Sequence, residues 1–142
     1  MDIKVSWAGN AAFVGESGSG HKVVMDGPAE GGGRDLGPRP MEMLLLGTGA
    51  CSSYDVISIL KKARQDIQAC DVSIHSERAE SEPKVFTKIH IQFKVSGNNL
   101  KEKQVQRAVS LSAEKYCSAS LMLGATAEVT HGYEILEVDG TL

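Results

Sequence analysis

Residues 40–65, PMEMLLLGTGACSSYDVISILKKARQ, decide the fold of this chain. Apolar side chains recur at helical spacing from Leu44 to Leu60, which predicts one long helix ending near Gln65. Pro40 suits the first helical position, where its missing N–H costs no hydrogen bond. We expect this helix to be the central element around which the rest of the chain packs.

Two glycines interrupt the predicted helix. Gly47 and Gly49 each cost roughly 1 kcal/mol relative to alanine inside a helix. We therefore expect both at places where a neighbouring backbone or a second subunit comes close.

Three short strands precede the helix, at about residues 3–7, 12–15 and 22–26, and glycine-containing turns join them. Residues 27–40 then hold five glycines and three prolines, which predicts a loop that is either mobile or functional. Three short strands cannot bury a core alone, so the loop is not a domain linker. The prediction is a single domain over residues 1–142.

Alternating apolar residues continue the pattern after the helix. Strands are predicted at 70–79 and 85–96, a helix from a capping box at Asn99 and Glu102, a short helix at 119–123, and a strand at 127–138. The order is βββ-α-ββ-α-α-β. Because strands are grouped and do not alternate with helices, we expect the α+β class with antiparallel sheets.

Composition excludes several classes of protein. The net charge is −3, with no basic cluster, so neither nucleic acid nor an anionic membrane is expected as a partner. The N-terminus lacks a signal-peptide pattern, and the longest apolar run, 43–46, is too short to span a bilayer. We expect a cytoplasmic protein whose three cysteines are reduced at rest.

The cysteines are the candidate reactive residues. Cys51 shares a helix face with Asp55, and on the residues alone such a cysteine is more often a small core residue than a nucleophile. Cys117 precedes a short helix whose amides would favour the thiolate. Cys70 lies at the start of a predicted strand, and we expect it to have a structural role.

No motif predicts a metal or a cofactor. The sequence has no CxxC, HxxxH or HExxH spacing, and Gly31–Gly33 lacks the features of a phosphate loop. His131 falls on the apolar side of the last strand, which favours a hydrogen-bonded core histidine. We expect no metal site and no cofactor.

Two segments resemble a known family. Residues 40–51, PMEMLLLGTGAC, resemble the first cysteine helix of the OsmC/Ohr proteins, and residues 113–120, AEKYCSAS, resemble their second cysteine segment. The resemblance covers nearly the whole chain and is strongest to the YhfA-like subgroup. It implies the OsmC-like fold and an intertwined homodimer.

The resemblance also implies a thiol-dependent peroxidase acting in oxidative stress defence. Cys51 would attack an organic hydroperoxide and become a sulfenic acid, Cys117 would form a disulfide with it, and a lipoyl-type dithiol would reduce that disulfide. The family glutamate after the helix-starting proline is Met41 here, so Glu42 is the nearest acid, about 180° from Cys51 on an ideal helix. No arginine lies between residues 7 and 13, where the family has one, so Arg39 or Arg34 would replace it.

A second reading stays open. Without the glutamate and the arginine at their usual positions, the chain could be a non-catalytic dimer that binds a small apolar ligand or senses oxidants at the same cysteines.

Overall fold

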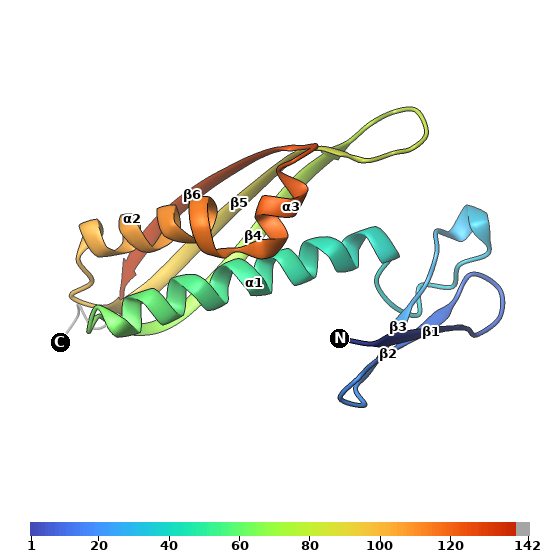
Figure 1. Cartoon of the computed structure of the whole chain (residues 1–142), viewed down its shortest axis with the longest axis horizontal. Coiled ribbons are helices and arrows are strands. Elements are labelled where there is room, and N and C mark those ends of the chain that lie inside the picture. The colour runs from blue at the N-terminus through green and yellow to red at the C-terminus, as the bar shows by residue number, and fades with distance from the viewer. Residues whose placement is uncertain (139–142) are drawn as a thin grey trace. The chain divides into compact units, whose positions relative to one another are not determined.

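The computed structural model describes residues 1–138 and divides into two compact units, residues 1–46 and residues 47 onward. Helix α1 begins in the first unit and continues into the second. The elements along the chain are β1 (Ile3–Trp7), β2 (Phe13–Ser17), β3 (Lys22–Met25), the 3₁₀ turn η1 (Ala29–Gly31), α1 (Pro40–Lys62), β4 (Asp66–Arg78), β5 (Phe86–Asn98), α2 (Glu102–Leu111), the π-helical turn η2 (Ser112–Tyr116), α3 (Ser118–Leu123) and β6 (Glu128–Glu137). This order confirms the predicted α+β class, with two sheets and a long central helix (Figure 1).

The first unit is an antiparallel meander. Strand β2 lies between β1 and β3, with Val5 opposite Gly15 and Gly15 opposite Val23. All five residues of β1 are exposed, including Trp7 at 70%. The sheet therefore leaves much of its apolar surface uncovered within its own unit.

The glycine- and proline-rich loop is organised around one buried carboxylate. Asp26 accepts hydrogen bonds from the backbone N–H groups of Gly27 (2.8 Å), Arg34 (2.9 Å) and Leu36 (3.2 Å). The Arg34 N–H lowers the pKa of this carboxyl most, and the other two N–H groups add to the effect against burial. The loop is thus held in one conformation by Asp26.

The second unit contains a sheet in the order β4–β5–β6. Strands β4 and β5 are antiparallel, with Ile74 opposite Ile91, but β6 runs parallel to β5. The expectation of antiparallel sheets throughout is therefore wrong for β6. The reason is that α2, η2 and α3 form a crossover, which returns the chain to the end where β5 began.

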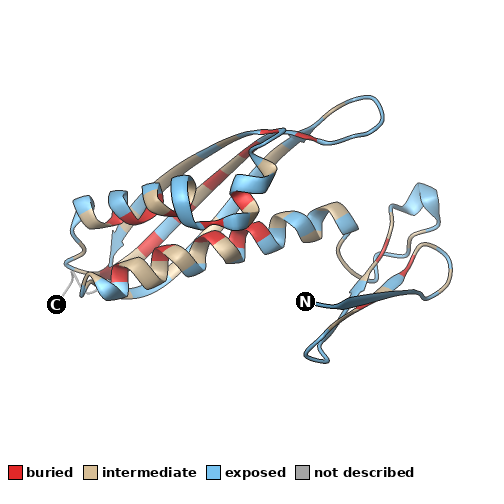
Figure 2. Ribbon diagram, in the orientation of Figure 1, coloured by how far each residue is buried: buried red, intermediate tan, exposed pale blue. Residues whose placement is uncertain are grey.

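The helices cover one face of this sheet (Figure 1), and the buried positions gather on the facing sides of the helices and β5 (Figure 2). Strand β5 buries alternate residues on that face while its other residues stay at least partly exposed, as the period of a half-buried strand requires. The main core side chains are Val56, Leu60, Ile89, Ile91, Phe93, Val95, Val105, Ala108 and Val109.

Element boundaries differ from the predictions where local backbone geometry decides them. Helix α1 ends at Lys62, just before Arg64 takes the left-handed conformation (φ 59°), and β4 begins directly afterwards. The predicted capping box is not formed. Asn99 is also left-handed (φ 52°), its N–H donates to the Glu137 carboxylate at 3.1 Å, and Lys101 is the N-cap of α2.

The two helix glycines have different surroundings. A Cβ on Gly49 would lie 3.3 Å from Cδ1 of Ile74, which explains a glycine where α1 packs closely on β4. A Cβ on Gly47 would meet nothing within 4 Å. The close neighbours of Gly49 are side chains, so within residues 1–138 the expected close backbone is found at neither glycine, and contact with a second subunit stays a prediction.

Helix α1 is long and apolar enough, by length and composition alone, to cross a membrane. The apolar run at residues 43–46, which by itself is too short to span a bilayer, is only part of this helix. The core helix of a water-soluble protein passes the same test, so this property is weak evidence for a membrane span.

Candidate functional site

Cys51 and Cys117 lie together in the second unit. Cys51 is in the middle of α1, and Cys117 is the N-cap of α3. Their sulfurs and a carboxylate oxygen of Asp55 all lie within 4.8 Å of one another, and both thiols are free. The structure thus brings together the two cysteines that the sequence singled out, with Asp55 as a third group.

The π-helical turn η2 places Cys117. The N–H of Cys117 donates to the carbonyl of Ser112, five residues earlier, at 2.9 Å. This wide turn ends the α2 helix, and Cys117 then takes an extended conformation (φ −76°, ψ 98°) before α3 begins. Single π-turns of this kind are frequent at functional sites.

Two serines form hydrogen bonds with the Cys117 sulfur. Ser52 Oγ lies 3.0 Å from Sγ, and the N–H of Ser120 donates to it at 3.4 Å. Burial, which is complete, raises the pKa of Cys117, but the hydrogen bonds from Ser120, Ser52 and Cys51 together bring the pKa below its ordinary value. The site therefore stabilises a thiolate at Cys117.

The Cys51 sulfur is in the opposite situation. The Ala119 N–H lowers the pKa of Cys51, but burial, Cys117 and the charge of Asp55 outweigh it, and the pKa is raised. Cys51 is only partly buried, whereas Cys117 is inaccessible. The pair thus combines a partly exposed thiol whose pKa is raised with a buried thiol whose pKa is lowered.

Asp55 is held beside the pair by Ser112. Ser112 Oγ lies 3.3 Å from Asp55 Oδ2 and 3.3 Å from the carbonyl of Ser52. Burial raises the pKa of Asp55, and the Ser112 hydroxyl partly offsets this. The sequence placed Asp55 on the Cys51 face by its helical spacing but gave no sign that Ser112 or Ser52 would join the cluster.

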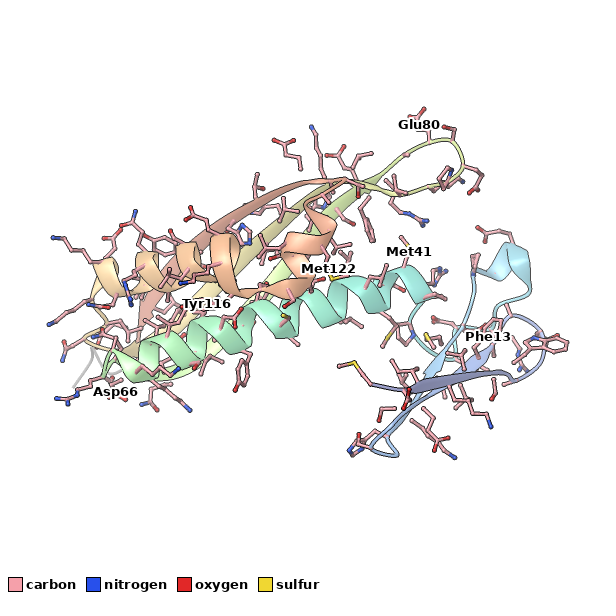
Figure 3. The ribbon with its side chains drawn as sticks, in the orientation of Figure 1. Phe13, Met41, Asp66, Glu80, Tyr116 and Met122 are labelled. Carbon is pink, nitrogen blue, oxygen red and sulfur yellow. The ribbon has the colours of Figure 1, made fainter. Side chains whose placement is uncertain are left out.

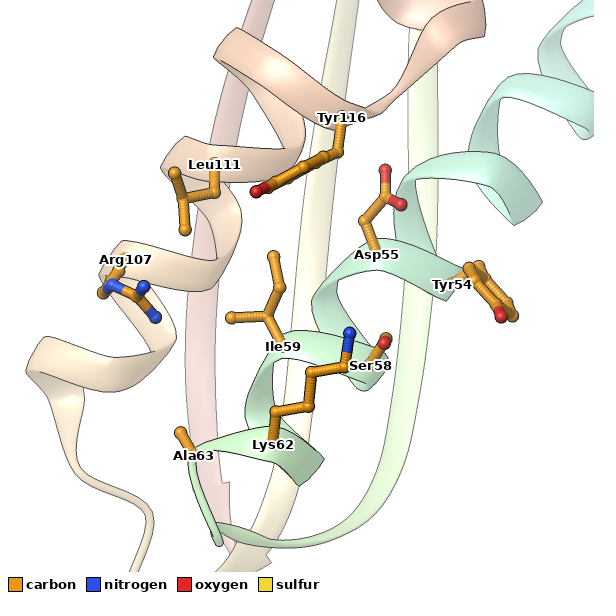
Figure 4. A pocket seen from close by; sticks show the side chains of 9 residues that line it. All are labelled: Tyr54, Asp55, Ser58, Ile59, Lys62, Ala63, Arg107, Leu111 and Tyr116. Carbon is orange, nitrogen blue, oxygen red and sulfur yellow. The ribbon is translucent and has the colours of Figure 1, made fainter.

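A pocket of about 540 Å³ adjoins Asp55 (Figure 4). It lies between α1 and the α2–η2 segment, and its lining mixes apolar side chains with polar and charged ones, including the cations of Lys62 and Arg107. Figure 4 shows Ile59 and Leu111 on facing helices, with the Tyr116 ring beside them. The cluster therefore has a neighbouring space able to take a small, partly apolar molecule.

The other two predicted site residues, Glu42 and Arg39, belong to the first unit and interact with each other. The backbone N–H of Arg39 donates to Glu42 Oε1 at 2.9 Å, which is the reciprocal half of a capping box at the start of α1. Met41 stands beside them at the same helix start (Figure 3). Their predicted action on Cys51 stays a prediction.

The remaining candidates have structural surroundings. Burial raises the pKa of Cys70, which is half-buried on β4. His131 stacks on Phe93 with ring centroids 6.4 Å apart, and burial lowers its pKa. Within residues 1–138 its Nε2 has no hydrogen-bond partner, so the expected hydrogen-bonded histidine is not found at that nitrogen.

Comparison with known proteins gives consistent matches. The sequence profile of the family described as OsmC-like protein matches residues 31–132. Protein YhfA of Escherichia coli (strain K12) is 48% identical over 136 residues, which cover 96% of this chain and 98% of YhfA.

Solved structures agree with these matches. A hypothetical protein from Aquifex aeolicus VF5 has a TM-score of 0.85 at 28% identity, covering 97% of each chain. The organic hydroperoxide resistance protein OhrB of Bacillus subtilis has a TM-score of 0.63 at 19% identity, covering 94% of this chain and 96% of OhrB, and at that identity the likeness concerns the fold alone.

Proposed function

The chain belongs to the OsmC-like family, and on that premise we propose that it reduces organic hydroperoxides through Cys51 and Cys117, in defence against oxidative stress. One observation carries the proposal. A partly exposed thiol and a buried thiol from two distant segments have their sulfurs within 4.8 Å of each other. Structures of organic hydroperoxide resistance proteins among the fold's neighbours support it.

The first step uses the single proton that the pair shares. The Cys51 sulfur attacks the outer peroxide oxygen and breaks the O–O bond, so that Cys51 becomes a sulfenic acid and an alkoxide leaves. The Cys51 proton passes to the Cys117 thiolate and from there to the alkoxide, which leaves as an alcohol. The charge of the pair stays at −1, and the step needs no base beyond Cys117.

The second step forms the disulfide. The Cys117 thiolate attacks the sulfenic sulfur and displaces hydroxide, which gives a Cys51–Cys117 disulfide. A lipoyl-type dithiol then reduces this disulfide, restores both thiols and itself becomes a disulfide. In this cycle Cys51 is the nucleophile and Cys117 the resolving residue.

We also infer a homodimer. Apolar side chains of the first unit are exposed in the single chain, among them Ile3 (70%) and Val5 (58%), and a second copy would cover them. Val5→Glu should weaken self-association in sedimentation experiments by about ten-fold or more, since burying a charge is costly. Lys4→Asp on the same strand is the control, and equal effects of the two substitutions would contradict an apolar interface there.

The cellular location and the roles of Arg39 and Glu42 also belong to the proposal. Cys51 and Asp55 lie on α1 within the polar cluster of the site, which favours a cytoplasmic enzyme over one whose central helix spans a membrane. Arg39 and Glu42 are proposed as helpers of the cysteine site only through the family resemblance.

The alternative is a non-catalytic dimer that binds a small apolar ligand or senses oxidants. The pocket beside Asp55 and the raised pKa of Cys51 favour this reading, because a protonated thiol is a slow nucleophile. Such a protein would form the disulfide once and would not turn over.

One assay separates the two functions. An alkyl hydroperoxide and a lipoyl-type dithiol are supplied to the wild type, to Cys51→Ser and to Cys70→Ser, and peroxide consumption is followed. We expect many turnovers by the wild type and Cys70→Ser and none by Cys51→Ser. Absence of wild-type turnover would contradict the peroxidase, and unchanged turnover by Cys51→Ser would contradict the nucleophile.

A further inference from the structure

We propose that the reduced side chains of Cys51, Asp55 and Cys117 form a binding site for a thiophilic divalent cation, with Zn²⁺ as the best fit. Neither the family match nor the peroxide chemistry assigns such a site. The inference concerns the resting, reduced protein and does not require that the protein turn over peroxide.

The geometry of the three side chains suits a tetrahedral ion. Their ligand atoms all lie within 4.8 Å of one another. Two sulfurs bound to one zinc ion at about 2.3 Å lie about 3.8 Å apart, so the cluster needs only small side-chain rotations to close on an ion. Cys51 and Asp55 are four residues apart on one helix, which places both on the same face of α1.

The charges of the cluster call for a cation. Two thiols and a carboxylate share a partly buried space, and each can supply one negative charge. A divalent ion bound among them is attracted to every negative charge that the cluster can form, and it offsets the repulsion between those charges.

The ligand types select the ion. Thiolates favour zinc over hard cations such as Mg²⁺, which prefer oxygen ligands and octahedral geometry. Three protein ligands leave a fourth position for water. The hydroxyl of Ser112 lies 3.3 Å from Asp55, and that of Ser52 lies 3.0 Å from the Cys117 sulfur, so both can orient the ligands from outside.

The sequence alone could not reveal this site, since the ligands come from two distant segments and match no metal-binding spacing.

A bound zinc ion would also change the reactivity of the two thiols. Zinc and the disulfide use the same two sulfurs, so a bound ion blocks attack by Cys51 on a peroxide.

The test titrates the full-length reduced protein with Zn²⁺ against a chromophoric chelator, and with Cd²⁺ to follow thiolate–metal charge-transfer absorption. We expect one ion per chain, and loss of binding in Cys51→Ala and in Cys117→Ala. Asp55→Asn should weaken binding at least about ten-fold. The same substitution removes a negative charge that raises the pKa of Cys51, so this pKa should fall. A substitution that merely disturbed the site would not lower it.

Three controls are matched to the ligands. Cys70→Ala removes a thiol and Asp71→Asn removes a carboxylate outside the cluster, and both should bind zinc as the wild type does. Mg²⁺ should not compete with zinc. Circular dichroism without metal checks that each variant is folded.

A measurement on the wild type covers the case of a variant that does not fold. Zinc should protect Cys51, but not Cys70, from alkylation, as mapped by peptide mass spectrometry, whereas Cys117 is buried with or without the ion. Zinc binding that persists in Cys51→Ala or Cys117→Ala, or zinc that leaves Cys51 as reactive as before, would overturn the site. Zinc binding without peroxide turnover would instead overturn the proposed peroxidase alone.

Discussion

The two units of this chain differ in how far they bury their apolar side chains. In the second unit Leu60 and Phe93 are fully buried, and the cysteine pair lies against this core. In the first unit every residue of β1 is exposed, and Trp7 and Ile3 each reach 70%. The unit with its own core holds the cysteine pair, while the other leaves the apolar side chains of β1 exposed in the single chain.

The same contrast separates the four predicted site residues. Cys51 and Cys117 meet in the second unit, where burial and hydrogen bonds change their pKa values in opposite directions. Glu42 and Arg39, in the first unit, are joined to each other at the start of α1. The difference shows that a residue beside a motif in the sequence can cap a helix there, while the action of Glu42 and Arg39 on Cys51 stays a prediction.

The largest expected effect comes from Cys117→Ser. This variant should form the Cys51 sulfenic acid slowly, because Cys117 no longer takes the Cys51 proton. It should then stop after one turnover, because no thiol remains to displace hydroxide from the sulfenic acid. A sulfenic acid probe such as dimedone should then label Cys51 and, in the wild type, should not. Continued turnover by Cys117→Ser would show that another thiol resolves the intermediate.

Leu60→Ala tests the core of the second unit. The side chain is fully buried, so its truncation should lower the free energy of unfolding by about 2–5 kcal/mol in urea denaturation. Leu36→Ala, an exposed leucine of the first unit, is the matched control and should change the stability little. Similar costs for both would erase the contrast between the units.

Glu42→Ala tests the helix start. Loss of the capping hydrogen bond should cost about 1 kcal/mol of stability, and loss of the proposed helper should slow peroxide consumption. Glu42→Gln keeps an acceptor oxygen and should restore most of the stability but not the activity. Peroxide consumption at the wild-type rate in both variants would contradict the helper role and leave Glu42 with its capping role alone.

The smallest effect is expected at Asp26. Its pKa is lowered in the folded chain, so its contribution to stability is present above the ordinary carboxyl pKa of about 3.9 and is lost as the pH falls through the lowered value. Asp26→Asn should speed hydrogen exchange at the amides of Gly27, Arg34 and Leu36 near neutral pH. Hydrogen exchange at the wild-type rate would show that the loop keeps its conformation without the Asp26 carboxylate.

The sequence predicted the parts of the fold that follow from local periodicity. The long helix from Pro40, the meander before it and the β4–β5 pair were all visible in the spacing of apolar residues. The parallel pairing of β6 was not, because strand direction depends on the path of the crossover and not on the strand's own residues. The false capping box at Asn99 failed because its left-handed backbone is set by tertiary contacts.

The candidate site could likewise be predicted only in part from the sequence. The two cysteines could be named, but only a resemblance linked them, since nothing in the chain's local pattern pairs α1 with the turn before α3. The serines could not be found at all. Ser112 and Ser52 are ordinary helix residues in the sequence. They matter because the π-helical turn places Ser112 beside Asp55 and the Cys117 sulfur beside Ser52.

The most direct test of the central claim is the disulfide itself. The reduced full-length protein is treated with one equivalent of an alkyl hydroperoxide and no reductant, and its peptides are mapped by mass spectrometry without reduction. We predict one product, with Cys51 joined to Cys117 and Cys70 still a free thiol. A product in which Cys51 stays a thiol, or pairs with Cys70, would contradict the account.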